Sequence, residues 1–250
     1  MKLRIYGFGV VGSSLYKWLK ENTKHEINIV DPDKNYFDHA WIANYAFMCV
    51  PVPTIDCGHM GWEQNYSILE HCIKQTSESE TIFVRSTVLP GTCDKLSKNF
   101  NRKIVAMPEF LTERNADQDM KDLNICVGTY DDVISGDLKS IFPGKSIINS
   151  TNLEAEMGKF LNNVNGATNV HTSSIFYQLC EKYRCNYEKV LQVGNMPGYL
   201  GELYRAQPGP DGQLGYGGKC FDKDMKAFAT FSCYDSINKI IEENEVIRNE

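Results

Sequence analysis

Gly7-Phe8-Gly9-Val10-Val11-Gly12 is the stretch that decides the fold of this chain. It follows the apolar run Lys2–Tyr6, which predicts a strand, and it opens the segment Val11–Glu21, whose apolar residues repeat at helical spacing. A GxGxxG motif between a strand and a helix is typical of dinucleotide-binding βαβ units. The first glycine permits the tight turn, the second lets a pyrophosphate approach the backbone, and the third lets helix and strand pack closely. We therefore expect the following residues to bind a dinucleotide: Gly7, Gly9, Val10, Val11 and Gly12.

An acidic residue ends the second predicted strand. The strand covers Glu26–Val30, and Asp31 follows it nineteen residues after Gly12. A carboxylate at this place accepts hydrogen bonds from a ribose 2′-hydroxyl and repels a 2′-phosphate. The sequence therefore favours NAD over NADP as the cofactor.

The rest of the first half alternates short apolar runs with amphipathic stretches, as βαβ units do. Further strands are predicted at residues 46–50, 81–85, 103–106, 124–127 and 146–148, and helices at 66–75 and 91–99. The nearly continuous apolar character of these strands indicates a sheet covered on both faces. We expect an α/β fold with a Rossmann-type doubly wound sheet, an NAD-binding domain over residues 1–149.

The second half has a helical rhythm. Thr151 or Asn152 can cap a long helix over residues 153–184. Acidic residues in the first turn of this helix also favour its start there. A short helix at 187–193, a Gly/Pro-rich loop over 197–218 and two helices at 222–231 and 236–249 follow. Residues 150–250 are therefore expected to form an all-helical central domain.

Composition narrows the function classes. The chain has 250 residues, of which 42% are hydrophobic and 23% charged, with a formal net charge of −6. This acidic balance argues against nucleic-acid or membrane-surface binding. Neither the nine cysteines nor the five histidines have metal-ligand spacing, so no metal site is expected. Without a leader or an apolar run of about 20 residues, the expected location is the cytoplasm.

One cysteine has unusual neighbours. In the segment Gly215-Tyr216-Gly217-Gly218-Lys219-Cys220-Phe221-Asp222-Lys223-Asp224, three glycines precede a thiol at the expected start of a helix. The helix N-terminus, together with Lys219 and Lys223, would lower the pKa of the Cys220 thiol and make it more nucleophilic. A buried structural cysteine is the alternative interpretation.

This segment closely resembles the GFGGxCFxKD signature of the UDP-glucose/GDP-mannose dehydrogenase family. Four other motifs resemble those of the family and follow in the same order: Cys49-Val50-Pro51-Val52-Pro53, Ser86-Thr87-Val88-Leu89-Pro90-Gly91-Thr92, Pro108-Glu109-Phe110-Leu111-Thr112-Glu113, and Ala155-Glu156-Met157-Gly158-Lys159-Phe160-Leu161-Asn162-Asn163. The resemblance covers essentially the whole chain.

The resemblance implies an activity. Family members oxidise the 6-alcohol of a nucleotide sugar to the carboxylate with two NAD⁺, so UDP-glucose becomes the expected substrate and UDP-glucuronate the expected product. By the same resemblance, Cys220 would trap the aldehyde as a thiohemiacetal, which is oxidised to a thioester that water hydrolyses.

The resemblance also assigns roles to other residues. Lys159 and Asn163 lie four residues apart on one helix, where both can point at a developing oxyanion. Asp224 and Thr87 would orient the hydrolytic water, and Glu113 would handle protons near the nicotinamide. The cofactor contacts would further include Val50, Pro51, Ser86, Thr87 and Glu113. The substrate contacts would be Glu109, Phe110, Leu111, Lys159, Asn163, Gly217 and Lys223.

The chain departs from the family pattern in places. Val52 replaces a threonine, Ser174-Ile175 stands where many members have Asn-Glu, and Lys219 stands where serine is common. Typical members continue into a second Rossmann-like domain that binds the nucleotide of the sugar. Because the sequence ends at residue 250, we expect a short form that lacks this second domain. We also expect a homodimer or higher oligomer through the C-terminal helices, where four isoleucines would face a partner subunit: Ile237, Ile240, Ile241 and Ile247.

Two other functions remain open. A simple hydroxyacid dehydrogenase also places a lysine and an asparagine on its central helix, but it would release one NADH per turnover and tolerate Cys220→Ser. An NAD-binding pseudoenzyme, or a subunit that depends on a partner chain, would bind the cofactor without turnover by itself.

Overall fold

The structure, a computed structural model, describes residues 1–37, 41–58, 61–201 and 204–249. The chain divides into two compact units. The first contains Met1–Ile55 and Gln64–Lys159, and the second contains Asp56–Glu63 and Phe160–Glu250. Each unit is described below by itself.

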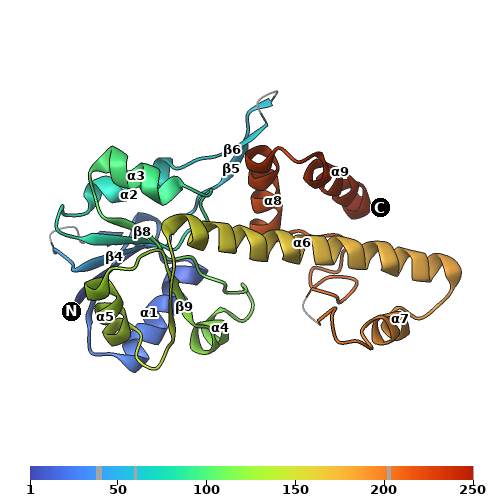
Figure 1. Cartoon of the computed structure of the whole chain (residues 1–250), viewed down its shortest axis with the longest axis horizontal. Helices are drawn as coiled ribbons and strands as arrows, with labels where there is room; N and C mark the ends of the chain where they lie inside the picture. Colours follow the sequence, from blue (N-terminus) through green and yellow to red (C-terminus); the bar gives the residue numbers. More distant parts are fainter. Residues whose placement is uncertain (38–40, 59–60, 202–203, 250) are drawn as a thin grey trace. The chain divides into compact units, whose positions relative to one another are not determined.

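The first unit is built on a six-stranded sheet with the order β3-β2-β1-β4-β7-β8, of which Figure 1 labels β4 and β8. Its strands are β1 (Lys2–Tyr6), β2 (Glu26–Asp31), β3 (Tyr36–Phe37), β4 (Tyr45–Met48), β7 (Thr81–Val84) and β8 (Ile104–Ala106). All neighbours are parallel except β2 and β3. The strand order reverses direction between β1 and β4, and this is the place where ligands bind in doubly wound sheets.

Helices cover both faces of this sheet. On one side lie α1 (Val10–Asn22), α4 (Ala116–Asp122) and α5 (Asp132–Ile141), and on the other α2 (Ser67–Gln75) and α3 (Thr92–Phe100). A parallel pair, β9 (Ile125–Val127) and β10 (Ile147–Asn149), follows β8, and the Gly128 N–H donates to the Ala106 carbonyl at 2.7 Å. The expected Rossmann-type doubly wound sheet is therefore confirmed.

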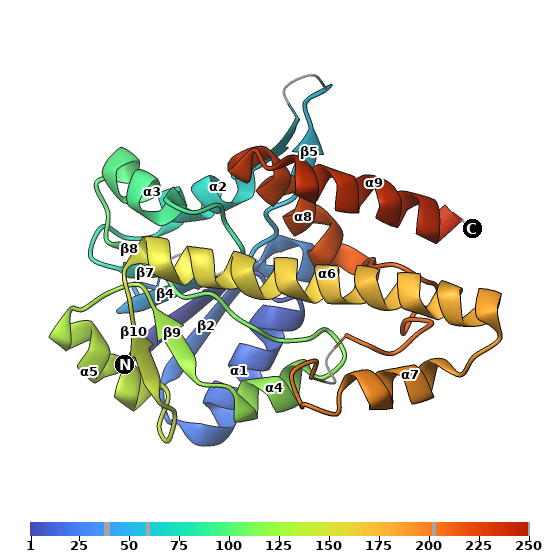
Figure 2. The same ribbon diagram turned by 45° about the vertical axis from the view of Figure 1, so that its right-hand side comes forward.

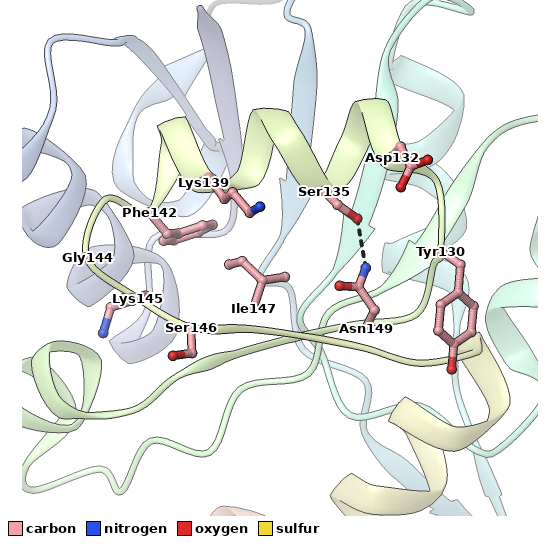
Figure 3. A pocket seen from close by; sticks show the side chains of 10 residues that line it. All are labelled: Tyr130, Asp132, Ser135, Lys139, Phe142, Gly144, Lys145, Ser146, Ile147 and Asn149. Atoms are coloured by element: carbon pink, nitrogen blue, oxygen red, sulfur yellow. Dashed lines mark hydrogen bonds between the residues drawn. The ribbon is translucent and has the colours of Figure 1, made fainter.

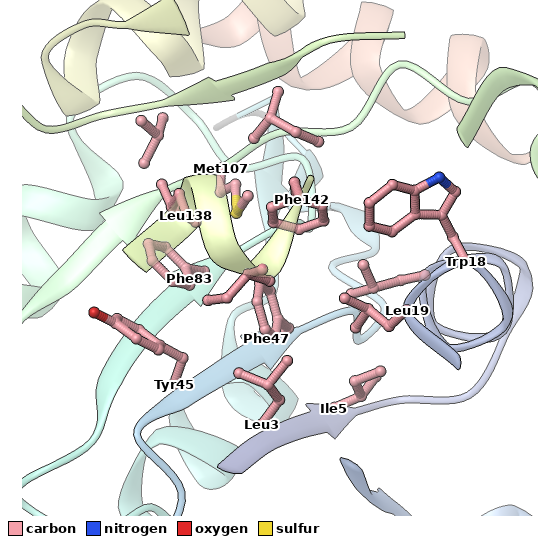
Figure 4. Close-up of a cluster of buried hydrophobic side chains, with 14 of the residues drawn as sticks. Leu3, Ile5, Trp18, Leu19, Tyr45, Phe47, Phe83, Met107, Leu138 and Phe142 are labelled. Atoms are coloured by element: carbon pink, nitrogen blue, oxygen red, sulfur yellow. The ribbon is translucent and has the colours of Figure 1, made fainter. Parts of the chain in front are cut away.

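Alternation along the strands divides the apolar residues between two cores. On β4, Tyr45 and Phe47 join the core beneath α1 and α5, and Ala46 and Met48 join the core beneath α2 and α3. Figure 4 shows the first core, in which the Phe47 and Phe83 rings stack with centroids 5.3 Å apart. Each large side chain buried in this way contributes about 1.5–3 kcal/mol.

Some elements escaped the sequence prediction. The helices α4 and α5 and the short strands β3, β5 (Thr54–Asp56) and β6 (Trp62–Gln64) were not expected. For α5 the signal was present, because the Asp131 side chain caps this helix by accepting from the N–H groups of Val133 and Ile134 at 2.9 and 3.1 Å.

The second unit is dominated by helices, as expected. The long helix α6 (Asn152–Tyr183) begins in the first unit and continues in the second, which also contains α7 (Tyr187–Gly194), α8 (Gly218–Ser232) and α9 (Asp235–Asn249). Thr151 and Glu154 form a capping box at the start of α6: the Glu154 carboxylate accepts from the Thr151 N–H at 2.8 Å, and the Thr151 hydroxyl accepts from the Glu154 N–H at 3.2 Å. Among the described residues, none of the helices is long and apolar enough to cross a membrane.

The helices α8 and α9 pack against each other (Figure 2) over a small core that includes Met225 and Ile241. This packing corrects the expectation for the C-terminal isoleucines. Ile241 and Ile247 are buried within the chain, and Ile237 and Ile240 are partly buried against the same core. Ile241 and Ile247 therefore leave water within their own unit, and the oligomer through the C-terminal helices stays a prediction.

Candidate active site

The glycine turn between β1 and α1 has the geometry that the motif predicts. Gly7 has φ +83°, and a Cβ atom there would lie 2.6 Å from the Cys49 carbonyl oxygen. A Cβ atom at Gly12 would lie 2.0 Å from the Gly7 carbonyl oxygen. Gly9, in contrast, has no atom within 4 Å of its would-be Cβ and stands at the N-cap of α1. The residues present therefore fit a pyrophosphate at Gly9, against the N–H groups at the start of α1.

Asp31 ends β2 beside this turn. Its Oδ2 accepts a hydrogen bond from the Phe8 N–H at 2.6 Å, and the Lys34 Nζ donates to the Phe8 carbonyl at 2.5 Å. The carboxylate expected to bind ribose thus also holds the glycine turn in place. Val10, 41% exposed, and Val11, half-buried, follow on the first turn of α1.

The loops after β4 and β7 are joined at the same edge of the sheet. The Ser86 hydroxyl donates to the Val50 carbonyl at 2.6 Å, and the Ser86 N–H donates to the Met48 carbonyl at 3.2 Å. Pro51 is exposed next to buried Val50, and Thr87 is half-buried next to Ser86. Four predicted cofactor residues (Val50, Pro51, Ser86 and Thr87) therefore lie on two loops that are fixed to each other.

Two buried polar residues support the second of these loops, and sequence reasoning gave neither a role. Gln64 accepts from the Leu89 N–H at 2.8 Å and donates to the Thr87 carbonyl at 3.3 Å. Glu156, on α6, accepts from the N–H groups of Gly91 and Cys93 at 2.6 and 2.8 Å and so caps α3. Burial raises the pKa of Glu156, and those hydrogen bonds oppose the shift. The position of Glu156 within the AExxK motif was the available signal.

The predicted substrate residues of the first unit gather around Lys159. Its Nζ lies 3.7 Å from a Glu109 carboxylate oxygen, and both side chains are nearly buried. The same ammonium lies 5.2 Å from the centre of the Phe110 ring. The other Glu109 oxygen accepts from the Leu111 N–H at 2.6 Å and fixes the loop after β8. The structure therefore brings Glu109, Phe110, Leu111 and Lys159 together.

Glu113 is exposed and lies near the glycine turn instead. It lines an open depression of about 470 Å³ together with Val10, Ser13 and Lys17 of α1. Its role beside the cofactor stays a prediction.

In the second unit, Asn163 and Asp224 form a buried pair. The Asn163 Nδ2 donates to Asp224 Oδ2 at 2.7 Å, and the two residues are 5% and 1% exposed. The Lys223 ammonium contacts the other oxygen of Asp224. The carboxylate predicted to orient water is therefore held by an amide on one side and a cation on the other.

Cys220 is exposed in the first turn of α8. The helix begins at Gly218, four residues before the expected start, because Gly217 supplies an extended N-cap with φ −146°. Asp224 follows one turn after Cys220 on the same helix. At the cofactor loops of the first unit, burial raises the pKa of the Cys49 thiol to about 12.

A close approach between α6 and α8 sets this geometry. A Cβ atom at Gly166 would lie 2.7 Å from the Phe221 ring. Phe221 follows Cys220 directly, so its contact with Gly166 fixes the first turn of α8 against α6. Joint roles for residues of different units, such as Thr87 with Asp224 or Lys159 with Asn163, remain predictions.

A second depression, of about 560 Å³, lies between α5 and β10 (Figure 3). Some of its polar side chains are engaged: the Asn149 amide donates to the Ser135 hydroxyl at 2.7 Å, and Lys145 donates to two backbone carbonyls. None of the predicted site residues lines it.

Comparison with known proteins identifies the family of this chain. Residues 34–144 match the NAD binding domain of the UDP-glucose/GDP-mannose dehydrogenase family, and residues 153–246 match its central domain. The chain is 25% identical over 211 residues to UDP-glucose 6-dehydrogenase of Rickettsia prowazekii, covering 80% of this chain and 45% of that protein. It is 28% identical over 203 residues to GDP-mannose 6-dehydrogenase of Pseudomonas putida, covering 74% and 45%.

A solved structure shares the fold. The UDP-glucose dehydrogenase from Pyrobaculum islandicum superposes with a TM-score of 0.81 at 19% identity, covering 98% of this chain and 68% of that one. The chain spans less than half the length of the two relatives named above. Two consecutive domain models of one family together match most of the residues of this chain. The chain belongs to the UDP-glucose/GDP-mannose dehydrogenase family and carries its NAD-binding and central domains.

Proposed function

We propose that this protein catalyses the NAD-dependent, four-electron oxidation of a nucleotide-sugar 6-alcohol to the carboxylate, with UDP-glucose as the first candidate substrate. One observation carries the proposal. An exposed thiol, Cys220, stands one helical turn before Asp224, which is 1% exposed and held by Asn163. A two-electron hydroxyacid dehydrogenase has no use for a nucleophile at this place.

NAD⁺, when bound, accepts the hydrides that leave C6 of the sugar. The chain's own residues hold it: the open face of Gly9 receives the pyrophosphate, and Asp31 receives the ribose. The acidic Asp31 also disfavours a cofactor with a 2′-phosphate.

Cys220 carries the covalent chemistry. Its thiolate adds to C6 of the aldehyde and forms a C–S bond, and the carbonyl oxygen takes up a proton to give a thiohemiacetal. Loss of hydride from C6 and of the hydroxyl proton gives a thioester. Water then adds to the thioester carbonyl, the C–S bond breaks, and the products are the carboxylate, the thiol and protons. The start of α8 favours the thiolate, because helix N-termini stabilise negative charge.

The remaining residues position oxygen atoms and protons. Lys159 is a nearly buried cation that compensates a developing oxyanion, and Glu109 keeps it in place at 3.7 Å. Asn163 holds the Asp224 carboxylate at 2.7 Å, and Asp224 orients the hydrolytic water. Glu113, which shares a depression with Val10, handles protons on the cofactor side.

The deciding experiment measures NADH formed per mole of limiting UDP-glucose in the presence of excess NAD⁺. A yield of two, with UDP-glucuronate as product, supports the four-electron reaction. Cys220→Ser should abolish the carboxylate, whereas Cys233→Ser, a change at another exposed cysteine, should leave the yield at two. Full carboxylate yield from the Cys220 variant would exclude the thioester route.

Other yields identify the alternatives. One NADH per substrate, retained in Cys220→Ser, indicates a two-electron dehydrogenase. If NAD binds but neither UDP-glucose nor GDP-mannose and other nucleotide sugars yield NADH, the chain is a pseudoenzyme or depends on a partner chain. GDP-mannose belongs in the panel because a relative at 28% identity is named for it.

A further inference from the structure

The glycine turn that leads to Cys220 is held by side chains from another helix, α9. The Tyr216 N–H donates to Asn244 Oδ1 at 2.8 Å, and Asn244 Nδ2 donates to the Tyr216 carbonyl at 3.0 Å. Asn244 is 3% exposed, so these two hydrogen bonds occupy its amide in a buried place.

Arg248, one turn further along α9, holds the same segment. Its Nη1 donates to the Gly215 carbonyl at 3.3 Å, and its Nη2 donates to the Asp211 carboxylate and the Gln213 side chain at 3.0 and 2.5 Å. A Cβ atom at Gly217 would lie 2.6 Å from the guanidinium carbon. The guanidinium therefore lies directly against the backbone of Gly217.

A third contact comes from α6. The Ser174 hydroxyl accepts from the Gly215 N–H at 2.8 Å and donates to the Val170 carbonyl at 2.9 Å. Ser174 is one of the departures from the family pattern, and it is completely buried. The backbone of Gly215 and Tyr216 is thus fixed by three side chains, although glycine-rich segments are intrinsically the most flexible.

We propose that Asn244 and Arg248 are positioning residues for the Cys220 nucleophile. Gly217 is the N-cap of α8, and Cys220 lies in the first turn of that helix. The contacts on residues 215–217 therefore decide where the helix starts and which N–H groups face the thiol. Removing them lets the turn move and weakens the stabilisation of the thiolate by the helix N-terminus. This inference rests on the proposed function for its catalytic meaning.

The test follows alkylation of Cys220 by iodoacetamide as a function of pH, without sugar or NAD, with site-resolved mass spectrometry. The exposed residues Cys185 and Cys233 serve as internal references in the same sample. In Arg248→Met and Asn244→Ala we expect the midpoint of the alkylation profile of Cys220 to rise by about 0.5 to 1 pH unit. Arg248→Lys should recover part of the shift, since it keeps the charge but loses the forked hydrogen bonds.

The matched control on the same helix is Lys239→Gln. Lys239 is 72% exposed and pairs only with Glu242 among the salt bridges of the described residues, so its removal should leave the Cys220 profile unchanged. An unchanged or lowered midpoint in both Arg248→Met and Asn244→Ala would overturn the proposal. Faster alkylation with an unchanged midpoint counts against it too, because it indicates only better access.

Gly217→Ala gives a second test that does not depend on removing a buried amide. The new methyl group would displace the Arg248 guanidinium, while φ −146° suits alanine. The midpoint should therefore rise in Gly217→Ala alone and rise no further in the double variant with Arg248→Met. Additive shifts would show that the two residues act independently and would contradict the proposal.

These measurements separate the two inferences. If the midpoints shift but UDP-glucose and the other nucleotide sugars yield no NADH, Asn244 and Arg248 position Cys220 and this chain does not catalyse the proposed reaction by itself. If the wild-type chain yields two NADH per UDP-glucose but the midpoints stay fixed, the proposed reaction is right and Asn244 and Arg248 do not position Cys220.

Discussion

Asp31 combines a structural contact with an expected cofactor contact, and two substitutions separate them. In the wild type the Phe8 N–H donates to Asp31 Oδ2 at 2.6 Å. Asp31→Asn keeps a side-chain oxygen that can accept this hydrogen bond, whereas Asp31→Ala removes the acceptor. We expect NAD affinity to fall about tenfold or more in Asp31→Ala, because hydrogen bonds to charged groups contribute about 1.5–3 kcal/mol. Asp31→Asn should lose less affinity for NAD and improve the relative affinity for NADP.

Calorimetric titration with both cofactors measures this, with exposed Asp33→Ala as the control that should bind like the wild type. Equal NAD affinity in Asp31→Ala and the wild type would show that Asp31 does not bind the ribose.

Glu156 makes stability depend on pH. Burial raises the pKa of this carboxyl in the folded chain, so the folded state holds its proton to higher pH than the unfolded state does. Its contribution to stability is therefore fully present below the unfolded pKa and declines as pH rises through the folded pKa. Glu156→Gln lacks this titration, so the wild type should lose stability relative to the variant from its usual pKa range upward.

Urea unfolding of both proteins at a series of pH values measures the difference. A difference that stays constant, or that grows in favour of the wild type as pH rises, would contradict the raised pKa. Glu154→Gln is the matched control. The Glu154 carboxyl of the wild type is on the same helix, but hydrogen bonds to Thr151 lower its pKa.

The turn between β1 and α1 assigns different tasks to glycines three residues apart. Gly12→Ala would bring a methyl group 2.0 Å from the Gly7 carbonyl oxygen, so it should lower the free energy of unfolding by about 3 kcal/mol or more. Gly9→Ala meets no atom within 4 Å and should change the stability by less than about 1 kcal/mol. Gly9→Ala should instead weaken NAD binding, because its methyl group occupies the place of the pyrophosphate.

Thermal unfolding and NAD titration of both variants separate these effects. Normal NAD affinity in a well-folded Gly9→Ala would place the pyrophosphate elsewhere.

The elements that sequence reasoning found are those with a periodic signal of their own. The strand β4 is apolar on both faces because both faces are covered, and the long helix α6 has a capping box at its start. The strands β5 and β6 mix polar with apolar residues and so form no apolar run, whereas the equally short strands β8, β9 and β10 consist mainly of apolar residues. Apolar runs and periodicity therefore found the main sheet and the longest helix and missed β5 and β6.

The residues of the candidate site also fall into two groups, those that sequence motifs identify and those that only the fold brings together. Motif residues such as Asp31 and Cys220 could be found because their chemistry depends on neighbours in sequence. Asn244 and Arg248 could not, because they act on residues 28 and 33 positions away, through packing that only the folded chain creates. The glutamates at 242, 243 and 245 are exposed, as charged residues on a helix usually are, but Asn244 among them is buried.

The two compact units predict how the whole molecule responds to NAD. The glycine turn, Asp31 and the loops after β4 and β7 all belong to the first unit, and the Cys220 helix belongs to the second. A ligand that binds only the folded state stabilises it by about 2.7 kcal/mol at a concentration of 100 times its Kd. Hydrogen exchange with saturating NAD should therefore slow at residues 7–12, 28–34 and 49–53, while exchange in α9 stays as it was.

Gly9→Ala provides the control, since the same NAD concentration should protect it less at all three segments. Protection that appears in α9 and is absent from residues 7–12 would place the cofactor outside the first unit and contradict the assignment of the glycine turn. Protection in both regions would contradict the expectation that the effect of NAD stays within the first unit. Adding UDP-glucose to the NAD-bound protein should then extend the protection to residues 215–224, because the proposed reaction brings the sugar to Cys220.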